Sequence, residues 1–239
     1  MRVEQFKDCS LYLGDCRDIL PTLGKVDATI CDPPYGVNGG SGTKGKASSK
    51  TKYSPCFPDT PEYIKNVCAE AIKFCLSIST RMAITTGSRN MFCYPQPTDI
   101  GGFTHPAGNG LSYWGMVTFQ PILFYGRDPR IGKTISAMTH PMNSSADKRI
   151  NHPCPKPIKE WKWLVNKASL EGELILDPFM GSGTTGVACV ELNRKFIGIE
   201  LDENYFDGAC RRIENATKQV DMFFPRPAHP FPSTPVKEG

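Results

Sequence analysis

The stretch "LILDPFMGSGTTG", from Leu174 to Gly186, decides the fold. Its apolar start, within the run "ELILD", predicts a buried strand, and Thr184 begins a helical pattern. Between them, Gly181 and Gly183 open a literal GxGxxG that Gly186 completes. Glycines at such a turn let the backbone approach a ligand closely, where the amino terminus of the helix is electropositive. The stretch therefore predicts a ligand site at the carboxyl end of a parallel strand.

The acidic residues near this turn discriminate between ligands. GxGxxG alone is a weak signal that most often indicates a dinucleotide, and Glu200, at the end of the next strand "KFIGIE", suits ribose hydroxyls in either case. Asp177 at the strand tip would repel a pyrophosphate and attract an amino group. S-adenosylmethionine has an ammonium group, a ribose and no phosphate, so we expect this cofactor. A nucleotide-binding dehydrogenase is the alternative.

Lys156 is a candidate for the carboxylate of that cofactor. It lies in "HPCPKP", next to Pro157 at the start of a predicted helix, where it offers a cation close to free backbone donors. An ordinary solvated lysine is the alternative interpretation.

A second unusual stretch is "DPPYG", Asp32 to Gly36, after the apolar run "VDATIC". Pro33 and Pro34 each hold the preceding residue extended, so the strand stops there and the Asp32 carboxylate and the Pro33 carbonyl form two adjacent acceptors. Two acceptors suit an NH2 group, which has two hydrogens, such as the exocyclic amine of a nucleobase. Holding both hydrogens favours a pyramidal nitrogen whose lone pair faces a sulfonium methyl, while Tyr35 is free to stack on the base. The alternative is a turn with a core tyrosine.

Short β-rich runs alternate with helical patterns along the chain, which predicts parallel strands with crossover helices and an α/β fold. We expect strands at residues 9–15, 26–32, 81–86, 173–177 and 195–200, and helices at 17–23, from 61 to about 76, at 155–169, 184–192 and about 203–217. Residues 36–60 show no periodicity, and 87–151 contain one clear apolar run, "PILFYG". Five aromatic residues of that region could touch a bound partner or belong to the core, namely Phe92, Tyr94, Phe103, Tyr113 and Trp114.

Composition excludes several classes of protein. The 239 residues are 39% hydrophobic without an apolar run long enough for a membrane span, and "MRVEQFKDCS" is no signal peptide, so we expect a cytoplasmic protein. The ten cysteines are scattered without a CxxC pair, which favours reduced buried thiols over disulfides or zinc. The four histidines lack ligand spacing, and we expect no metal.

Positive charge gathers in two segments. Residues 36–60 carry Lys44, Lys46, Lys50 and Lys52 against Asp59, and residues 127–159 carry seven basic residues against two aspartates. Such segments suit a polyanion, although solvated loops are the alternative. If these four lysines contact the phosphates of a nucleic acid, as one such polyanion, its binding should weaken steeply with salt.

Together, "DPPYG", "HPCPKP", "DPFMGSGTTG" and "FIGIELDENYF" (Phe196–Phe206) resemble the amino-methyltransferases of DNA, in the permuted order of the β class. The resemblance implies a Rossmann-like methyltransferase fold with a mostly parallel seven-stranded sheet, one antiparallel strand and a closing antiparallel hairpin. It implies a catalytic half at 1–86 with a basic loop at 37–60, a target-recognition region at 87–151, a cofactor half at 152–221 and a proline-rich tail at 222–239.

The same resemblance implies the site residues and partners. The base would be flipped out and held by Asp32, Pro33, Pro34 and Tyr35. The cofactor would be held by Asp15 near its adenine and by Lys156, Asp177, Pro178, Phe179, Gly181, Ser182, Gly183, Thr184, Thr185 and Glu200. It implies double-stranded DNA as the substrate, S-adenosylhomocysteine as the second product, a monomer or homodimer, and a bacterial or phage-encoded protein of the restriction-modification type.

The first residue of "DPPY" bears on the choice of base. Aspartate at this position is the usual sign of N6-adenine methylation in this family, and serine more often accompanies N4-cytosine methylation, so we expect adenine. Exceptions run both ways, because two acceptors can serve either amine. N4-cytosine methylation is one alternative, and a DNA-binding relic without activity is another.

Overall fold

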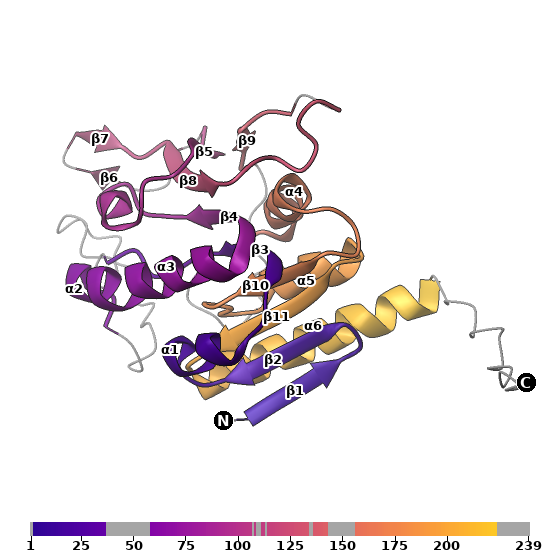
Figure 1. The fold of residues 1–239 in the computed structure, drawn as a ribbon. Helices are drawn as coiled ribbons and strands as arrows, with labels where there is room; N and C mark the ends of the chain where they lie inside the picture. Colours follow the sequence, from indigo (N-terminus) through magenta and orange to yellow (C-terminus); the bar gives the residue numbers. More distant parts are fainter. Residues whose placement is uncertain are drawn as a thin grey trace, which may run out of the picture.

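The computed structural model describes residues 2–36, 58–106, 108, 111–112, 114–133, 136–142 and 156–223. Nine strands form one sheet in the order β1-β2-β11-β10-β3-β4-β8-β5-β9 (Figure 1). These strands are β1 Arg2–Phe6, β2 Cys9–Leu13, β3 Val26–Cys31, β4 Ser79–Thr85, β5 Asp99–Thr104, β8 Phe119–Tyr125, β9 Thr139–Pro141, β10 Leu174–Asp177 and β11 Lys195–Glu200. A separate hairpin pairs β6 Leu111–Ser112 with β7 Gly115–Met116.

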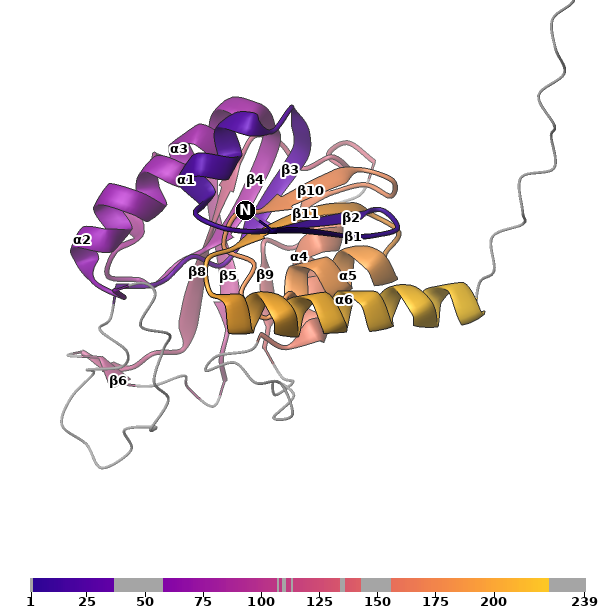
Figure 2. The same cartoon turned by 90° about the horizontal axis from the view of Figure 1, so that it is seen from below.

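The helices are α1 Cys16–Ile19, α2 Pro61–Tyr63, α3 Ala69–Ile78, α4 Ile158–Ala168, α5 Thr184–Glu191 and α6 Glu203–Phe223. Two 3₁₀ turns, Leu20–Thr22 and Met91–Cys93, and a π-helical stretch, Ile64–Cys68, complete the regular structure of the described residues. Figure 2 shows α1, α2 and α3 on one face of the sheet and α4, α5 and α6 on the other.

The α/β fold is confirmed, and the strand count is corrected. From β2 to β5 the sheet has the seven expected strands, of which only β8 runs antiparallel, between β4 and β5. The antiparallel pair of β8 and β5 is the expected hairpin. One further strand lies at each edge, β1 antiparallel to β2 and β9 parallel to β5. The strand β1 escaped the sequence analysis because it is a largely polar edge strand, of which Phe6 packs against the core.

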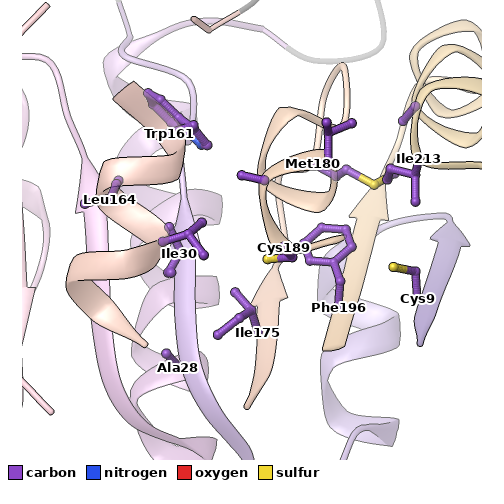
Figure 3. Close-up of a cluster of buried hydrophobic side chains, with 14 of the residues drawn as sticks. Cys9, Ala28, Ile30, Trp161, Leu164, Ile175, Met180, Cys189, Phe196 and Ile213 are labelled. Atoms are coloured by element: carbon purple, nitrogen blue, oxygen red, sulfur yellow. The ribbon is translucent and has the colours of Figure 1, made fainter. Parts of the chain in front are cut away.

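Two apolar clusters hold the three layers together, one on each face of the sheet. Alternate residues of a strand point to opposite faces, so Ala28 and Ile30 of β3 pack toward α4, while Cys31 packs with α3. Figure 3 shows Trp161 and Leu164 of α4 beside Ile30. The three layers therefore fix where each strand ends, and with it the place of the residues that follow.

Most expected elements form, with shifted ends. The helix expected from Pro61 is one continuous helical segment up to Ile78 with a π-helical stretch inside it, and β4 begins at Ser79, before the expected Arg81. The last helix reaches Phe223, beyond the expected Thr217, because no breaker occurs before Pro225, and Lys218 and Glu214 form an i,i+4 ion pair at 2.6 Å.

Eight cysteines lie in the described segments, and all are free thiols, with only Cys93 less than fully buried. Across the same segments, no cluster of three metal-binding side chains occurs. Within the described chain, no helix has both the length and the apolar character of a membrane span. The expected division into a catalytic and a cofactor half stays a prediction, since strands of both parts alternate in one continuous sheet.

Candidate active site

The two motif-bearing strands are direct neighbours. β3 pairs with β10 in parallel, with Thr29 opposite Leu176, so both chains leave the sheet at the same edge. Asp32 follows β3 and Asp177 ends β10, and both line one pocket of about 320 Å³. A crevice at the carboxyl ends of parallel strands is where open α/β sheets bind ligands. The fold therefore brings together Asp32 and Asp177, which are 145 positions apart in the sequence.

Asp177 is a buried carboxylate with two protein donors. Thr185 donates its hydroxyl to Oδ2 at 2.6 Å, and the backbone N–H of Phe179 donates to Oδ1 at 3.0 Å. Trp161 in turn donates its indole N–H to Thr185 Oγ1 at 3.0 Å, which fixes that hydroxyl. Burial raises the pKa of Asp177 to about 7, and the hydrogen bonds oppose this shift. Such a group favours a cationic neighbour.

Glu200 lies on the next strand and has a similar environment. The backbone N–H of Gly181 donates to Oε2 at 2.7 Å, and that of Asp202 donates to Oε1 at 2.8 Å. Burial raises the pKa of this carboxyl to about 7 as well. Each carboxylate oxygen has two lone-pair directions, so Glu200 and Asp177 can both accept further hydrogen bonds from a ligand.

The glycine turn between β10 and α5 is tightly packed from behind. Gly183 has φ +75°, and a Cβ there would lie 2.9 Å from the Cβ of Ala209 in α6. A Cβ on Gly186 would lie 2.8 Å from a ring carbon of Phe196. These glycines thus let α5 pack closely on α6 and on the sheet, and Gly183 is not among the residues that line the pocket.

Asp15 lines the other wall and already has a partner. Its carboxylate caps α1 and receives the Arg17 guanidinium, with Nη2 to Oδ2 at 2.6 Å. The hydrogen bonds from Arg17 lower the pKa of Asp15. A direct contact of this carboxylate with the adenine of a cofactor, as the family resemblance implies, stays a prediction.

At the far end of the pocket, Asp32 is held by three side chains. The Tyr35 hydroxyl donates to Oδ1 at 2.6 Å, and the Thr85 hydroxyl, at the end of β4, donates to the same oxygen. The Lys156 ammonium lies 2.9 Å from Oδ2. Lys156 therefore pairs with "DPPY" in this structure, and its expected contact with the cofactor carboxylate stays a prediction. Pro157, the next residue, is the N-cap of α4, a helix that packs against β3 and β4.

Tyr35 is fixed from several elements. Gln120, at the start of β8, donates its amide N–H to the Tyr35 hydroxyl, and Lys156 Nζ donates to the same oxygen at 3.2 Å. Asn90 donates to the Tyr35 carbonyl at 2.8 Å. Burial raises the pKa of the phenol, so it stays protonated at any ordinary pH. Its ring lies 5.0 Å from the Lys156 ammonium.

Most of the expected site residues share the pocket. Those that line it are Asp15, Asp32, Pro33, Pro34, Tyr35, Lys156, Asp177, Pro178, Phe179, Gly181, Ser182, Thr184, Thr185 and Glu200. Lys44, Lys46, Lys50 and Lys52 lie outside the described residues. Several further residues line the pocket without having been predicted from the sequence, among them Gly14, Tyr63, Gln120, Trp161, Leu201 and Tyr205. Tyr205 lies within the quoted "FIGIELDENYF", whereas no local pattern marks Gln120.

The aromatic residues of the middle region divide into two groups. Phe103 and Tyr94 are buried and belong to the core. Phe92 and Trp114 are 83% and 100% exposed, so they have no core role. Tyr113 lies outside the described residues.

The charge of the pocket restricts its ligands. Asp32, Asp177 and Glu200 all face it, and two of them are deeply buried. A pyrophosphate would meet these carboxylates at short range, while an ammonium and ribose hydroxyls would satisfy their remaining lone pairs. The arrangement disfavours a dinucleotide and suits a cationic nucleoside.

Comparison with known proteins agrees with this chemistry. Residues 111–211 match the family model N6_N4_Mtase, described as DNA methylase. The DNA adenine methyltransferase YhdJ of Escherichia coli K12 is 41% identical over 71 residues, 30% of this chain and 24% of the relative. The type II methyltransferase M2.DpnII of Streptococcus pneumoniae is 44% identical over 63 residues, 26% and 24% of the two chains.

These matches support the DNA N6/N4 methyltransferase family. The family expected from the motifs is confirmed. The aligned part spans about a quarter of the length of these curated DNA methyltransferases.

Solved structures of DNA methyltransferases share the fold. M1.HpyAVI in complex with SAM has a TM-score of 0.64 at 21% identity, covering 86% of this chain and 98% of that chain. The cytosine-N4-specific PvuII DNA methyltransferase has a TM-score of 0.64 at 13% identity, covering 90% and 93%. At such identities the likeness concerns the fold, and it confirms the Rossmann-like methyltransferase architecture.

Proposed function

We propose that this protein transfers a methyl group from S-adenosylmethionine to the N6 amino group of adenine in double-stranded DNA. The observation that carries the proposal is the adjacency of β3 and β10, which places Asp32 and Asp177 on one pocket of about 320 Å³. The end of the pocket at Asp177 suits the cofactor, and the end at Asp32 suits an amino group. Both groups can therefore meet in one pocket.

The residues at the β10 and β11 ends fit the cofactor. S-adenosylmethionine brings an electrophilic methyl group on a sulfonium centre. Asp177, whose pKa of about 7 reflects burial, would receive the cofactor ammonium, and Glu200 would accept from the ribose hydroxyls. Phe179, Pro178 and Tyr205 supply apolar walls for the adenine. A pocket of a few hundred Å³ is of the size typical of small-molecule sites.

Asp32 and Pro33 would hold the target amine. The lone pair of an exocyclic amine is delocalised into the base, which makes the nitrogen a poor nucleophile. Hydrogen bonds from both of its hydrogens, to Asp32 and to the Pro33 carbonyl, favour a pyramidal nitrogen whose lone pair faces the methyl group. As the new bond forms, the nitrogen gains positive charge, and the Asp32 carboxylate stabilises this charge and holds the surplus proton.

DNA binding is proposed from the charged segments and the pocket together. The target base must leave the helix to reach Asp32, since the amine lies inside a duplex. We assign phosphate contacts to Lys44, Lys46, Lys50 and Lys52, which follow "DPPYG" directly in the chain.

N4-cytosine methylation is the second candidate. It is favoured by the fold likeness to PvuII methyltransferase, which is named as cytosine-N4-specific, whereas YhdJ is named as an adenine enzyme. The aspartate of "DPPY" supports adenine here.

The experiment is to incubate the protein with unmethylated duplex DNA and methyl-labelled S-adenosylmethionine, digest the DNA, and separate the nucleosides. We expect the label in N6-methyl-2′-deoxyadenosine. Label in N4-methyl-2′-deoxycytidine would establish the second candidate. No label on DNA, although the protein binds the cofactor, would contradict methyl transfer and favour a relic, and binding of a nicotinamide nucleotide instead would favour a dehydrogenase.

A further inference from the structure

Gln120 enters the pocket from a strand that no motif marks. It lies at the start of β8, the antiparallel strand beside β4, and it is 7% exposed. A buried amide at a pocket wall needs partners for both its N–H groups and its carbonyl oxygen. Its amide hydrogen-bonds to Tyr35, which in turn hydrogen-bonds to Asp32.

The Tyr35 hydroxyl is the first link. Gln120 Nε2 and Lys156 Nζ both donate to its oxygen. A phenol has one hydrogen and two acceptor directions, and the two donors occupy those directions. The hydroxyl hydrogen is therefore committed to Asp32 Oδ1, at 2.6 Å.

The two oxygens of Asp32 consequently differ. Oδ1 accepts from the hydroxyls of Tyr35 and Thr85, which fill its lone pairs. Oδ2 faces the Lys156 ammonium at 2.9 Å and retains a lone pair. Oδ2 is thus the oxygen that can accept a hydrogen from a base.

We propose that Gln120 is a positioning residue for methyl transfer, which acts through the Tyr35 hydroxyl to direct Asp32 Oδ2 at the target amino group. The inference rests on the proposed function and adds a residue to it. Without the Gln120 donor, the Tyr35 hydroxyl can turn its hydrogen away from Asp32, and the carboxylate loses the bond that sets its rotation.

A double-mutant cycle tests the proposal. Gln120→Met keeps the length of the side chain and removes the amide. We expect kcat with saturating DNA and cofactor to fall about tenfold, with the cofactor dissociation constant unchanged. In a Tyr35→Phe background, where no hydroxyl remains to be oriented, the same substitution should change kcat less than about twofold.

Gln120→Glu gives a second, independent measurement. An ionised carboxylate has the same shape but accepts from the Tyr35 hydroxyl, which would pull the hydrogen away from Asp32. We expect its kcat to fall at least as far as that of Gln120→Met. The matched control is Ile122→Val, two residues farther along the same face of β8. This substitution removes one methylene group from the core and should leave kcat unchanged.

Equal loss from Gln120→Met in both backgrounds, or wild-type activity of Gln120→Glu, would overturn the positioning role. A wild-type protein that transfers no methyl group to DNA would instead refute the proposed function itself, so the two failures are distinguishable.

Discussion

The ammonium of Lys156 lies 2.9 Å from the carboxylate of Asp32, and both side chains are largely buried, with 14% and 23% of their surfaces exposed. The two residues are far apart in the sequence and meet because α4 begins beside the end of β3. Breaking one partner of a buried pair leaves an uncompensated charge, so this contact has consequences for activity.

Replacing Lys156 by methionine separates its two possible roles. If the lysine mainly orients Asp32, kcat falls about tenfold or more while the cofactor dissociation constant changes less than about threefold. Single-turnover methyl transfer and calorimetric titration of the cofactor provide the two values. Weak cofactor binding with an unchanged kcat at saturation would restore the assignment to the cofactor carboxylate.

Cofactor binding should strengthen as pH rises through 7. Burial raises the pKa of Asp177 to about 7, so the group is mostly neutral at pH 6 and mostly ionised at pH 7.5, and an ammonium needs the ionised form. We expect the dissociation constant for S-adenosylhomocysteine to fall about eightfold across this interval. Asp177→Asn cannot ionise and should show a weaker dependence. Equal affinity of the wild type at both pH values would contradict the assignment.

Gly183 and Gly208 form a matched pair for stability. Gly183→Ala forces a side chain into a conformation with φ +75° and a Cβ contact of 2.9 Å, so the free energy of unfolding should fall by about 2–3 kcal/mol. Gly208 lies in the middle of α6 with no atom within 4 Å of its added Cβ, and Gly208→Ala should stabilise by about 0.5–1 kcal/mol. Urea unfolding measures both. An unchanged free energy of unfolding for Gly183→Ala would show that the turn relaxes to accommodate the side chain.

The sequence predicted the parts of the site that local chemistry encodes. The prolines after Asp32 and the glycines after Asp177 mark strand ends, and strand ends of a parallel sheet share an edge. Neither motif alone showed that the two strands are neighbours, and the parallel register of β3 against β10 establishes it.

The partners of these residues were not predictable, because they depend on tertiary packing. The strand β5 contains Gly101 and Gly102, and glycines are unfavourable in strands. Here they are required, since a Cβ on Gly101 would lie 2.0 Å from the Met138 carbonyl oxygen. The roles of Gln120 and Lys156 likewise become visible only when β8 is placed beside β4 and α4 is packed against β3.

The most direct test of the account is Asp32→Ala. The carboxylate would contact the proposed target amine, and of the expected cofactor-binding residues it contacts Lys156. The variant should therefore bind S-adenosylmethionine with near wild-type affinity and transfer no detectable methyl group to DNA in a single turnover. Methyl transfer by Asp32→Ala at a rate near that of the wild type would contradict the central claim.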